Sequence, residues 1–318
     1  SILLRPWTGI KKDKENLVVW WIIRMLKLRI ISAVVMMLVF LLCFFVLPPI
    51  FFRILIYIIT AIVMVELFKL LEHCWVTKKD LQKKTYIIMT ILVGLFILTI
   101  SEFIDLEFKA YTYMCICVFG LFNWIFHVIP WISKKKSFQQ KVAQAVYGRH
   151  ITFQRTTSYP LYIILPLACS FLYLFTDDKH YLFFVLLIIW LADTGAYIAG
   201  KRFGRIKIAE NISPGKTLEG VIGAIVINII FMLVVGLNFS EFHIINGIVF
   251  GLMITLLSIY GDLFISWIKR SAGVKDTGNL IPGHGGFLDR VDSLLLALPF
   301  AALIKICANA FQSNFLTI

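Results

Sequence analysis

The stretch INGIVFGLMITLLSIYGDLFISWI, residues 245–268, contains a single charged side chain, Asp262. A helix needs about 20 predominantly apolar residues to cross the hydrocarbon core of a bilayer. This stretch meets that requirement, and an acid inside it is costly unless the acid is paired, hydrated or bound to a cation. The stretch therefore predicts a transmembrane helix that carries a functional carboxylate.

Eight more apolar runs share this character, and charged or turn-rich gaps separate them. Pro48 and Pro49 divide the first two runs, because the residue before a proline is pushed out of helical geometry. The nine predicted spans cover residues 30–46, 50–71, 86–100, 111–132, 161–175, 181–199, 220–237, 245–268 and 294–307. We therefore expect an all-α, polytopic integral membrane protein.

The composition agrees with this fold class. The 318 residues are 60% hydrophobic and 15% charged, with a mean hydropathy of +0.88, whereas soluble domains are about half apolar. Nine spans with short loops leave little room for a soluble unit, so residues 25–318 are predicted to form one transmembrane domain. Residues 1–24 are basic, and two alternatives stay open for them, an interfacial tail or an extension outside the fold.

Lysine and arginine are distributed unevenly between the loops. Of the 31 basic residues, 27 fall in the N-terminal segment and in every second loop, while the alternate loops contain only Lys109 and Lys179. Because basic loops stay on the cytoplasmic side, the N-terminus is predicted to be cytoplasmic. The net charge of +13 is then a feature of membrane topology, and we expect no nucleic-acid binding.

Charged and glycine-rich sequence is concentrated at the cytoplasmic ends of the last four predicted spans. One such segment covers residues 193–220 and includes SPGKT at 213–217. The other covers residues 261–292 and includes PGHGG at 282–286. Because the rest of the chain is mostly apolar, we expect the functional site to lie in these two segments.

Helical spacing groups the charged residues of the second segment. Ser266 follows Asp262 by four residues, and Lys269 and Arg270 follow Ser266 by three and four. Residues at these spacings lie on one face of a helix. The eighth span is therefore predicted to present all four side chains to one site.

Three carboxylates could converge at this site. Asp289 and Asp292 are three residues apart at the start of the ninth predicted helix, so they share a face. Together with Asp262 they would suit Mg²⁺, which takes oxygen ligands and keeps substrate phosphates in its shell. In the alternative interpretation the acids form structural salt bridges with Lys269, Arg270 and Arg290.

Both glycine-containing runs precede predicted helices and suit anion binding. In 282–286 backbone amides can approach phosphate oxygens, and the dipole of the following helix favours anions. His284 in this run is predicted to contact phosphate rather than to act as a general base. In 213–217 Lys216 and two hydroxyls offer similar contacts, although Glu210 stands where a Walker loop would begin with glycine. A turn with a helix cap is the alternative there.

Two further acids lie inside predicted spans. Asp193 is near the cytoplasmic end of the sixth span and is predicted to contact substrate or a second metal ion. Glu66 lies in the second span, one turn from Lys69 and two turns from His73. We interpret Glu66 as a locally paired charge.

The segments 193–220 and 266–292 resemble the phosphatidate cytidylyltransferase family, also called CDP-diacylglycerol synthases, of the bacterial type. The resemblance extends over nearly the whole chain from Met25 and includes 26–33 and Pro48-Pro49. It implies an enzyme that joins CTP to phosphatidic acid and forms CDP-diacylglycerol and pyrophosphate in phospholipid biosynthesis. It also implies that the acidic metal ligands are Asp262, Asp289 and Asp292.

The resemblance makes residues 25–318 a transmembrane catalytic domain of the bacterial inner membrane, with the active site at the cytoplasmic ends of the last four helices. The implied cofactor is Mg²⁺, and a second, monovalent cation is left open. The predicted catalytic residues are Asp262, Lys269, Arg270, Asp289, Arg290 and Asp292. The predicted substrate-binding residues are Asp193, Ser213, Lys216, Thr217, Ser266, Lys275, His284, Gly285 and Gly286.

Two other functions are alternatives at this point. A secondary transporter for an anionic solute would use the same cationic pocket, but transporter sites usually lie near the bilayer midplane in repeat-related helices. A CTP-dependent lipid-alcohol kinase would release CDP instead of pyrophosphate. The predicted partners are CTP, phosphatidic acid and the lipid bilayer, and a homodimer is left open.

Overall fold

The computed structural model describes residues 31–73, 80–102, 108, 110–121, 153–210, 212–238, 243–281 and 285–315. The long helices in these ranges are α2 (Pro49–His73), α3 (Asp80–Glu102), α6 (Phe153–Asp177), α7 (Lys179–Phe203), α8 (Leu218–Asn238), α9 (Ile244–Ser271) and α11 (Leu294–Phe315). A π-helical turn, η1 (Leu42–Val46), and a short helix, α10 (Leu288–Val291), accompany them. In this part of the chain β pairing is limited to two isolated bridges.

Each predicted span coincides with a helix in the described part of the chain. Four helices are long and apolar enough to cross a membrane: α2, α7, α8 and α9. Shorter apolar helices cover Ile31–Val46, Ile88–Ile100, Ala110–Leu121, Leu161–Asp177 and Leu294–Ala310. Residues 122–132 of the predicted fourth span lie outside the described residues. The all-α, polytopic membrane fold is thus confirmed, while the orientation of the termini stays a prediction.

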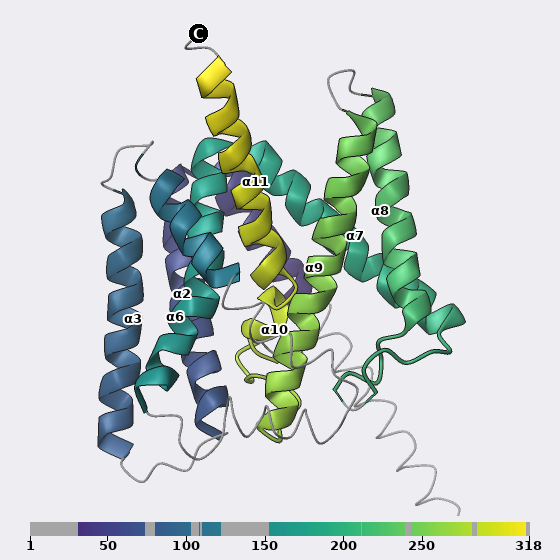
Figure 1. Cartoon of the computed structure of the whole chain (residues 1–318). Coiled ribbons are helices and arrows are strands. Elements are labelled where there is room, and N and C mark those ends of the chain that lie inside the picture. The colour runs from purple at the N-terminus through teal and green to yellow at the C-terminus, as the bar shows by residue number, and fades with distance from the viewer. Residues whose placement is uncertain are drawn as a thin grey trace, which may run out of the picture.

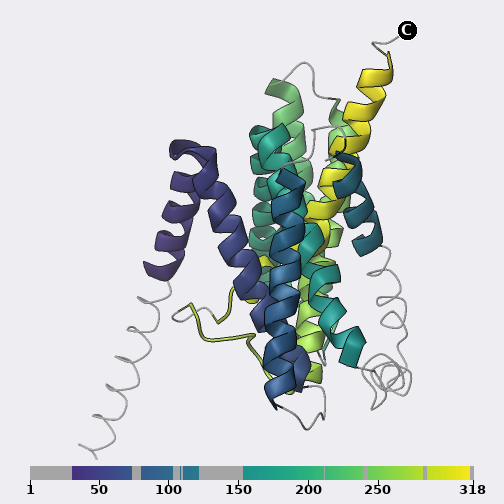
Figure 2. The same cartoon turned by 90° about the vertical axis from the view of Figure 1, so that its left-hand side faces the viewer.

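The break between the first two spans falls where the two prolines predict it. Leu47 is extended, with φ −80° and ψ 157°, as expected for the residue before Pro48. Pro49 is the first residue of α2, a position where the missing N–H removes no helical hydrogen bond. Figure 2 shows the helix Ile31–Val46 and α2 meeting at this break and diverging below it.

The helices form two groups that α11 joins (Figure 1). One group contains α2, α3 and α6, and the other contains α7, α8 and α9. The C-terminal helix α11 packs against α6 of the first group and against α9 and α7 of the second. Residues that precede α11 are therefore placed between the two groups.

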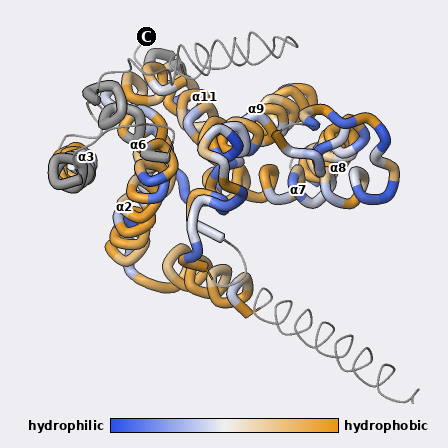
Figure 3. Tube along the Cα trace, turned by 90° about the horizontal axis from the view of Figure 1, so that it is seen from below, coloured by the Kyte–Doolittle hydropathy of each residue, from blue (hydrophilic) through white to orange (hydrophobic). Residues whose placement is uncertain are grey.

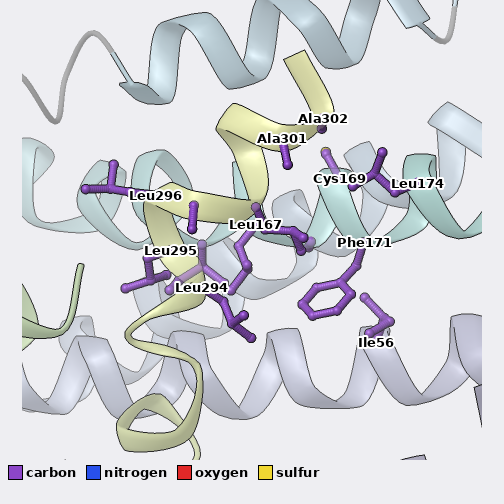
Figure 4. Close-up of a cluster of buried hydrophobic side chains, with 14 of the residues drawn as sticks. Ile56, Leu167, Cys169, Phe171, Leu174, Leu294, Leu295, Leu296, Ala301 and Ala302 are labelled. Carbon is purple, nitrogen blue, oxygen red and sulfur yellow. The ribbon is translucent and has the colours of Figure 1, made fainter. Parts of the chain in front are cut away.

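The start of α11 packs into the first group (Figure 4). The buried side chain of Leu294 lies near Leu167 of α6, and Leu295, Leu296, Phe171 of α6 and Ile56 of α2 belong to the same buried cluster. Because lipid tails are as apolar as leucine, close van der Waals fit rather than exclusion of water holds such helices together. This packing fixes the position at which α11 enters the bundle.

Polar sequence gathers at one end of the bundle. The segment between α7 and α8 and the segment between α9 and α10 both lie at the lower end in Figure 1. Seen from below in Figure 3, hydrophilic residues are concentrated in these segments, while most of the helix surface is hydrophobic. The two segments singled out in the sequence are therefore brought to the same end of the molecule.

Helices α7 and α8 approach each other closely because glycines face each other between them. A Cβ on Gly223 would lie 2.9 Å from the carbonyl oxygen of Gly195 and would overlap the Cβ of Ala199. Small residues at such contacts allow membrane helices to pack backbone to backbone. The contact also fixes Asp193, two residues before Gly195 on α7, relative to the start of α8.

We predict that Gly223→Ala destabilises the protein. Alanine is favoured over glycine within a helix by about 1 kcal/mol, but overpacking a close contact costs about 1–3 kcal/mol. The new Cβ meets an atom anchored on the backbone, so the overlap should prevail and the thermal unfolding temperature in detergent should fall. Gly215→Ala is the matched control, because a Cβ there has no atom within 4 Å. Equal unfolding temperatures for the two variants would contradict this account of the α7–α8 contact.

Candidate active site

A polar cavity of about 440 Å³ opens at the end of the bundle where the two glycine-rich segments meet. Helices α7, α8 and α9, the segment before α8 and the segment around α10 all contribute to its wall. The lining residues are Asp193, Ala196, Tyr197, Gly215, Lys216, Thr217, Gly220, Val221, Ile259, Asp262, Lys269, Asp276, Asp289, Arg290 and Asp292. The structure thus brings eight of the predicted site residues to one cavity: Asp193, Lys216, Thr217, Asp262, Lys269, Asp289, Arg290 and Asp292.

The segment between α7 and α8 is folded back so that its end reaches the cavity. The carboxylate of Glu219 accepts hydrogen bonds from the backbone N–H groups of Arg205 (3.0 Å) and Ile206 (3.2 Å). The N–H of Leu218 donates to the carbonyl of Ile206 at 2.9 Å. These contacts hold the two ends of the segment together, which places Lys216 at the cavity wall.

Thr217 and Lys216 show that the two interpretations of the SPGKT run are compatible. The hydroxyl of Thr217 accepts a hydrogen bond from the N–H of Gly220 at 3.2 Å, which is the predicted cap of α8. The next residue back, Lys216, extends into the cavity and forms an ion pair with Asp262. The run both starts the helix and supplies a cation.

Asp262 and Lys216 form a partly exposed ion pair. Their Nζ and Oδ2 atoms are 2.7 Å apart, and the two side chains are 22% and 31% exposed, Lys216 being the less exposed. Lys216 also donates to the carbonyl of Ile259 at 3.3 Å, and Ser266 donates to Asp262 Oδ1 at 3.3 Å. Asp262 therefore has the cationic partner that a charge in an apolar helix requires, although this partner is Lys216 rather than Lys269, Arg270 or Arg290, and both charges remain accessible from the cavity.

Several donors hold the carboxylate of Asp289. Lys269 Nζ lies 2.7 Å from its Oδ1 atom, and both side chains are nearly buried. Its Oδ2 atom accepts from the N–H of Thr277 (2.9 Å) and of Gly286 (3.1 Å) and lies 3.1 Å from the Thr277 hydroxyl. Burial alone would raise the pKa of Asp289, but Lys269 and the two N–H donors outweigh burial and lower it. Asp289 is thus an ionised carboxylate that organises its surroundings.

Asp292 has a different environment. It lies between α10 and α11, rather than inside one ninth helix as predicted, because α10 ends at Val291 and α11 begins at Leu294. Its carboxylate accepts a hydrogen bond from the N–H of Ser293 at 2.9 Å. Burial, followed by the negative charge of Asp262, raises the pKa of Asp292 well above its usual range. A cation beside Asp262 and Asp292 would relieve this repulsion.

The predicted three-carboxylate metal site is not assembled among the described residues. No group of three or more His, Cys, Asp or Glu side chains within them is arranged to hold a metal ion. For Asp289 the structure shows the alternative interpretation, a salt bridge to Lys269. Of the three predicted ligands, Asp262 and Asp292 remain as cavity-lining carboxylates with the donor chemistry of a hard cation, and Asp193 and Asp276 line the same cavity.

Arg270 departs from the predicted shared face of the eighth span. Its Nε donates to the carbonyl of Ile212 at 3.0 Å and its Nη1 to the carbonyl of Val274 at 2.9 Å. It is not among the cavity-lining residues. Arg270 follows Lys269 directly, and a step of one residue turns a helix by about 100°. Arg270 therefore ties the segment before α8 to the end of α9.

Several other predicted residues do not line the cavity. Ser213 lies in the turn before α8, where its N–H donates to the carbonyl of Ala209 at 2.8 Å. Lys275 is exposed, and His284 lies outside the described residues. Gly285 and Gly286 flank Asp289, and Gly285 needs glycine because its φ is +83°.

Protein carboxylates accept hydrogen bonds from backbone amides at the end of the glycine-rich run and directly after it. The N–H groups of Phe287 and Leu288 donate to Glu66 on α2, at 3.0 and 2.8 Å, and that of Gly286 donates to Asp289. Of the amides predicted to approach phosphate, that of Gly286 is thus occupied, and Glu66, interpreted from its spacing as a locally paired charge, has a long-range role as well. Glu66 is only 3% exposed. A buried acid inside a predicted span was the available signal for a long-range role.

An apolar cavity of about 540 Å³ lies beside the polar one. The helix Ile31–Val46, α2, α6 and α7 supply most of its wall, and Phe287, Arg290, Val291 and Leu294 close one side. Arg290 lines both cavities. The polar cavity and this apolar cavity, which we call the apolar groove, therefore share one cationic residue, Arg290.

Comparison with known proteins connects this arrangement to one family. The Cytidylyltransferase family matches residues 27–307. A phosphatidate cytidylyltransferase of Staphylococcus saprophyticus is 38% identical over 148 residues, which are 45% of this chain and 56% of that protein. A phosphatidate cytidylyltransferase of Staphylococcus aureus is 43% identical over 133 residues (41% and 51%), and that of Haemophilus influenzae is 42% identical over 133 residues (39% and 46%).

The chain spans about half the length of the curated relatives it matches. The family match is wider, since residues 27–307 include α2 to α10 and every residue that lines the polar cavity. The resemblance found in the two polar segments is thereby confirmed. The chain belongs to the cytidylyltransferase family.

Proposed function

We propose that this protein is a CTP:phosphatidate cytidylyltransferase, which converts CTP and phosphatidic acid to CDP-diacylglycerol and pyrophosphate. The observation that carries the proposal is the position of Arg290 between a cation-containing polar cavity and an apolar groove. A nucleoside triphosphate needs the first environment, and the acyl chains of a lipid need the second. The relatives' name, phosphatidate cytidylyltransferase, specifies transfer of a cytidylyl group to phosphatidate, which supports the proposal.

The chemistry requires positioning and charge neutralisation more than proton transfer. A phosphatidate oxygen attacks the α-phosphorus of CTP, a new P–O bond forms, and the bond to the β-phosphate oxygen breaks as pyrophosphate leaves. The phosphatidate phosphate is already ionised near pH 7, so the nucleophile needs little deprotonation. Such transfers depend on in-line geometry and on cations that stabilise the leaving oxygens. Lys216, Lys269 and Arg290 are the cations that line the cavity.

A divalent cation such as Mg²⁺ fits the carboxylates at the cavity. Asp262 and Asp292 would hold it, and this pairing is supported by the raised pKa of Asp292, which burial causes first and the negative charge of Asp262 second. Asp289 is the third predicted ligand, and its Oδ1 atom is already bound to Lys269. When bound, the ion would neutralise charge on the CTP phosphates. A monovalent cation beside the divalent one is also part of the proposed site.

The membrane supplies one substrate and the aqueous phase the other. The chain is a multi-pass membrane protein with four span-length helices among those described. Because the basic segments before α8 and around α10 line the polar cavity, we propose that the cavity faces the cytoplasm in the inner membrane of a bacterium. Phosphatidate would then enter sideways from the bilayer through the apolar groove.

We predict that Lys216→Ala strongly impairs the reaction. Purified protein given CTP, Mg²⁺ and phosphatidate should release pyrophosphate and form a CDP-lipid. Removing one preorganised donor to developing charge typically lowers the rate about 100-fold or more, so Lys216→Ala should lower kcat/KM by about that factor. The measurement is pyrophosphate release at varied CTP concentration.

Lys207→Ala is the matched control for this variant. Lys207 lies on the same segment, is exposed and does not line the cavity, so its loss should leave kcat/KM unchanged. Wild-type kcat/KM in Lys216→Ala, or an equal loss in Lys207→Ala, would argue against a nucleotide site at this cavity.

The apolar groove gives a second prediction. Val39 lines the groove on the helix Ile31–Val46, whereas its neighbour Leu38 does not. Val39→Trp should fill part of the groove and raise KM for long-chain phosphatidate several-fold, with KM for CTP unchanged. Leu38→Trp should change neither value, because Leu38 is exposed on the helix surface. Equal KM values for phosphatidate in both variants would place the acyl chains elsewhere.

A further inference from the structure

The carboxylate of Glu66 on α2 accepts three hydrogen bonds from residues that are distant in the sequence. The Thr277 hydroxyl donates to Oε2 at 3.0 Å, the N–H of Phe287 to Oε1 at 3.0 Å and the N–H of Leu288 to Oε2 at 2.8 Å. These donors are 211 to 222 residues away along the chain. The buried carboxylate therefore connects the first helix group to the segment that carries the site.

The Thr277 hydroxyl lies between two carboxylates. Its oxygen is 3.0 Å from Glu66 Oε2 and 3.1 Å from Asp289 Oδ2. A hydroxyl has one hydrogen, so it donates to one of these acceptors at a time. Gly286 allows the approach, because a Cβ there would overlap both Thr277 Oγ1 and Glu66 Oε2. Glu66 and Asp289 thus both contact Thr277, in the segment between α9 and α10.

The segment that Glu66 holds is the one on which the site depends. Leu288 begins α10, which carries Asp289 and Arg290. Glu66 itself lines neither cavity, so it acts through the backbone. The helix that carries Glu66, α2, forms part of the wall of the apolar groove. We propose that Glu66 is a positioning residue, which fixes Thr277 and residues 286–290 so that the Lys269–Asp289 pair and Arg290 keep their places between the polar cavity and the apolar groove.

The bonding pattern requires a carboxylate rather than an amide. Glu66 receives hydrogen bonds from two backbone N–H groups on different oxygens. Glutamine has one acceptor oxygen and one donor NH₂ group. Whichever way the amide is turned, its NH₂ faces the N–H of Phe287 or of Leu288, and one buried N–H loses its acceptor. Aspartate keeps both oxygens on a side chain that is shorter by one methylene.

The test compares Glu66→Gln and Glu66→Asp in the full chain purified in detergent. In Glu66→Gln, amide hydrogen exchange should accelerate in the peptide that contains Phe287 and Leu288 and stay unchanged in α8. Under the proposed function, kcat for pyrophosphate release should fall about 10- to 100-fold, with a smaller change in KM for CTP. Glu66→Asp should recover part of both the exchange protection and kcat.

Thr255→Val is the control for a general loss of stability. Thr255 is a buried threonine of α9 whose hydroxyl oxygen is 2.7 Å from Asn228 Nδ2 on α8, away from the cavity. Its replacement should lower the unfolding temperature without affecting exchange at Phe287 and Leu288 or kcat. An equal loss of kcat in Thr255→Val would overturn the proposal, because the effect of Glu66 would then be global.

Two other outcomes also decide the matter. Wild-type exchange at Phe287 and Leu288 in Glu66→Gln would show that Glu66 does not hold the segment, and faster exchange with unchanged kcat would show that the hold is structural only. Because the catalytic consequence rests on the proposed function, a wild-type protein that forms no CDP-lipid would count against that function. The exchange measurement would still decide whether Glu66 fixes the segment that contains Phe287 and Leu288.

Discussion

The carboxylate of Asp289 is the contact on which the candidate site depends. A charge placed within an apolar bundle must be paired and hydrogen-bonded, because isolated buried charges are too costly to keep. Asp289 meets this condition with Lys269 of α9 and with the N–H groups of Thr277 and Gly286. One carboxylate thus fixes the end of a long helix and the loop that follows it, and Arg290 is placed as the next residue along.

The two helix groups meet at this loop, and so do the two cavities. The lower end of α9 and the segment before α8 supply the polar wall, whereas α2, α6 and the helix Ile31–Val46 supply the apolar one. Helix α11 packs between the groups. It begins at Leu294, shortly after α10, and therefore anchors the C-terminal end of the loop. A water-soluble and a lipid substrate could therefore react only where both surfaces are present, which is the neighbourhood of Arg290.

The sequence predicts the helices and much of the site because both depend on local patterns. Apolar runs of span length give the helices, and Pro48-Pro49 gives their first break. Residues at the same ends of consecutive spans lie on the same side of the membrane and near one another. The glycine-rich segments therefore also predict that Lys216, Asp262 and Lys269 belong to one site. Their charges are opposite, and the structure pairs Lys216 with Asp262.

What the sequence does not predict is set by contacts between distant segments. Glu66 has a basic neighbour one turn away, so local spacing explains it without reference to residues more than 200 positions later. Arg270 shares a helical spacing with Asp262 and Ser266, but the carbonyls of Ile212 and Val274 determine where it points. For Asp289 the sequence leaves a metal ligand and a salt bridge to Lys269 as alternatives, and the salt bridge forms because α9 packs beside α10.

The most direct measurement of the central claim is to follow label from CTP into lipid. CTP labelled at the α-phosphorus and CTP labelled at the γ-phosphorus would each be incubated with purified protein, Mg²⁺ and phosphatidate. The account predicts that α-label enters a lipid product and γ-label is released as pyrophosphate, because the cytidylyl group is transferred. Transfer of γ-label to lipid, with CDP as the other product, would contradict it and would identify a kinase.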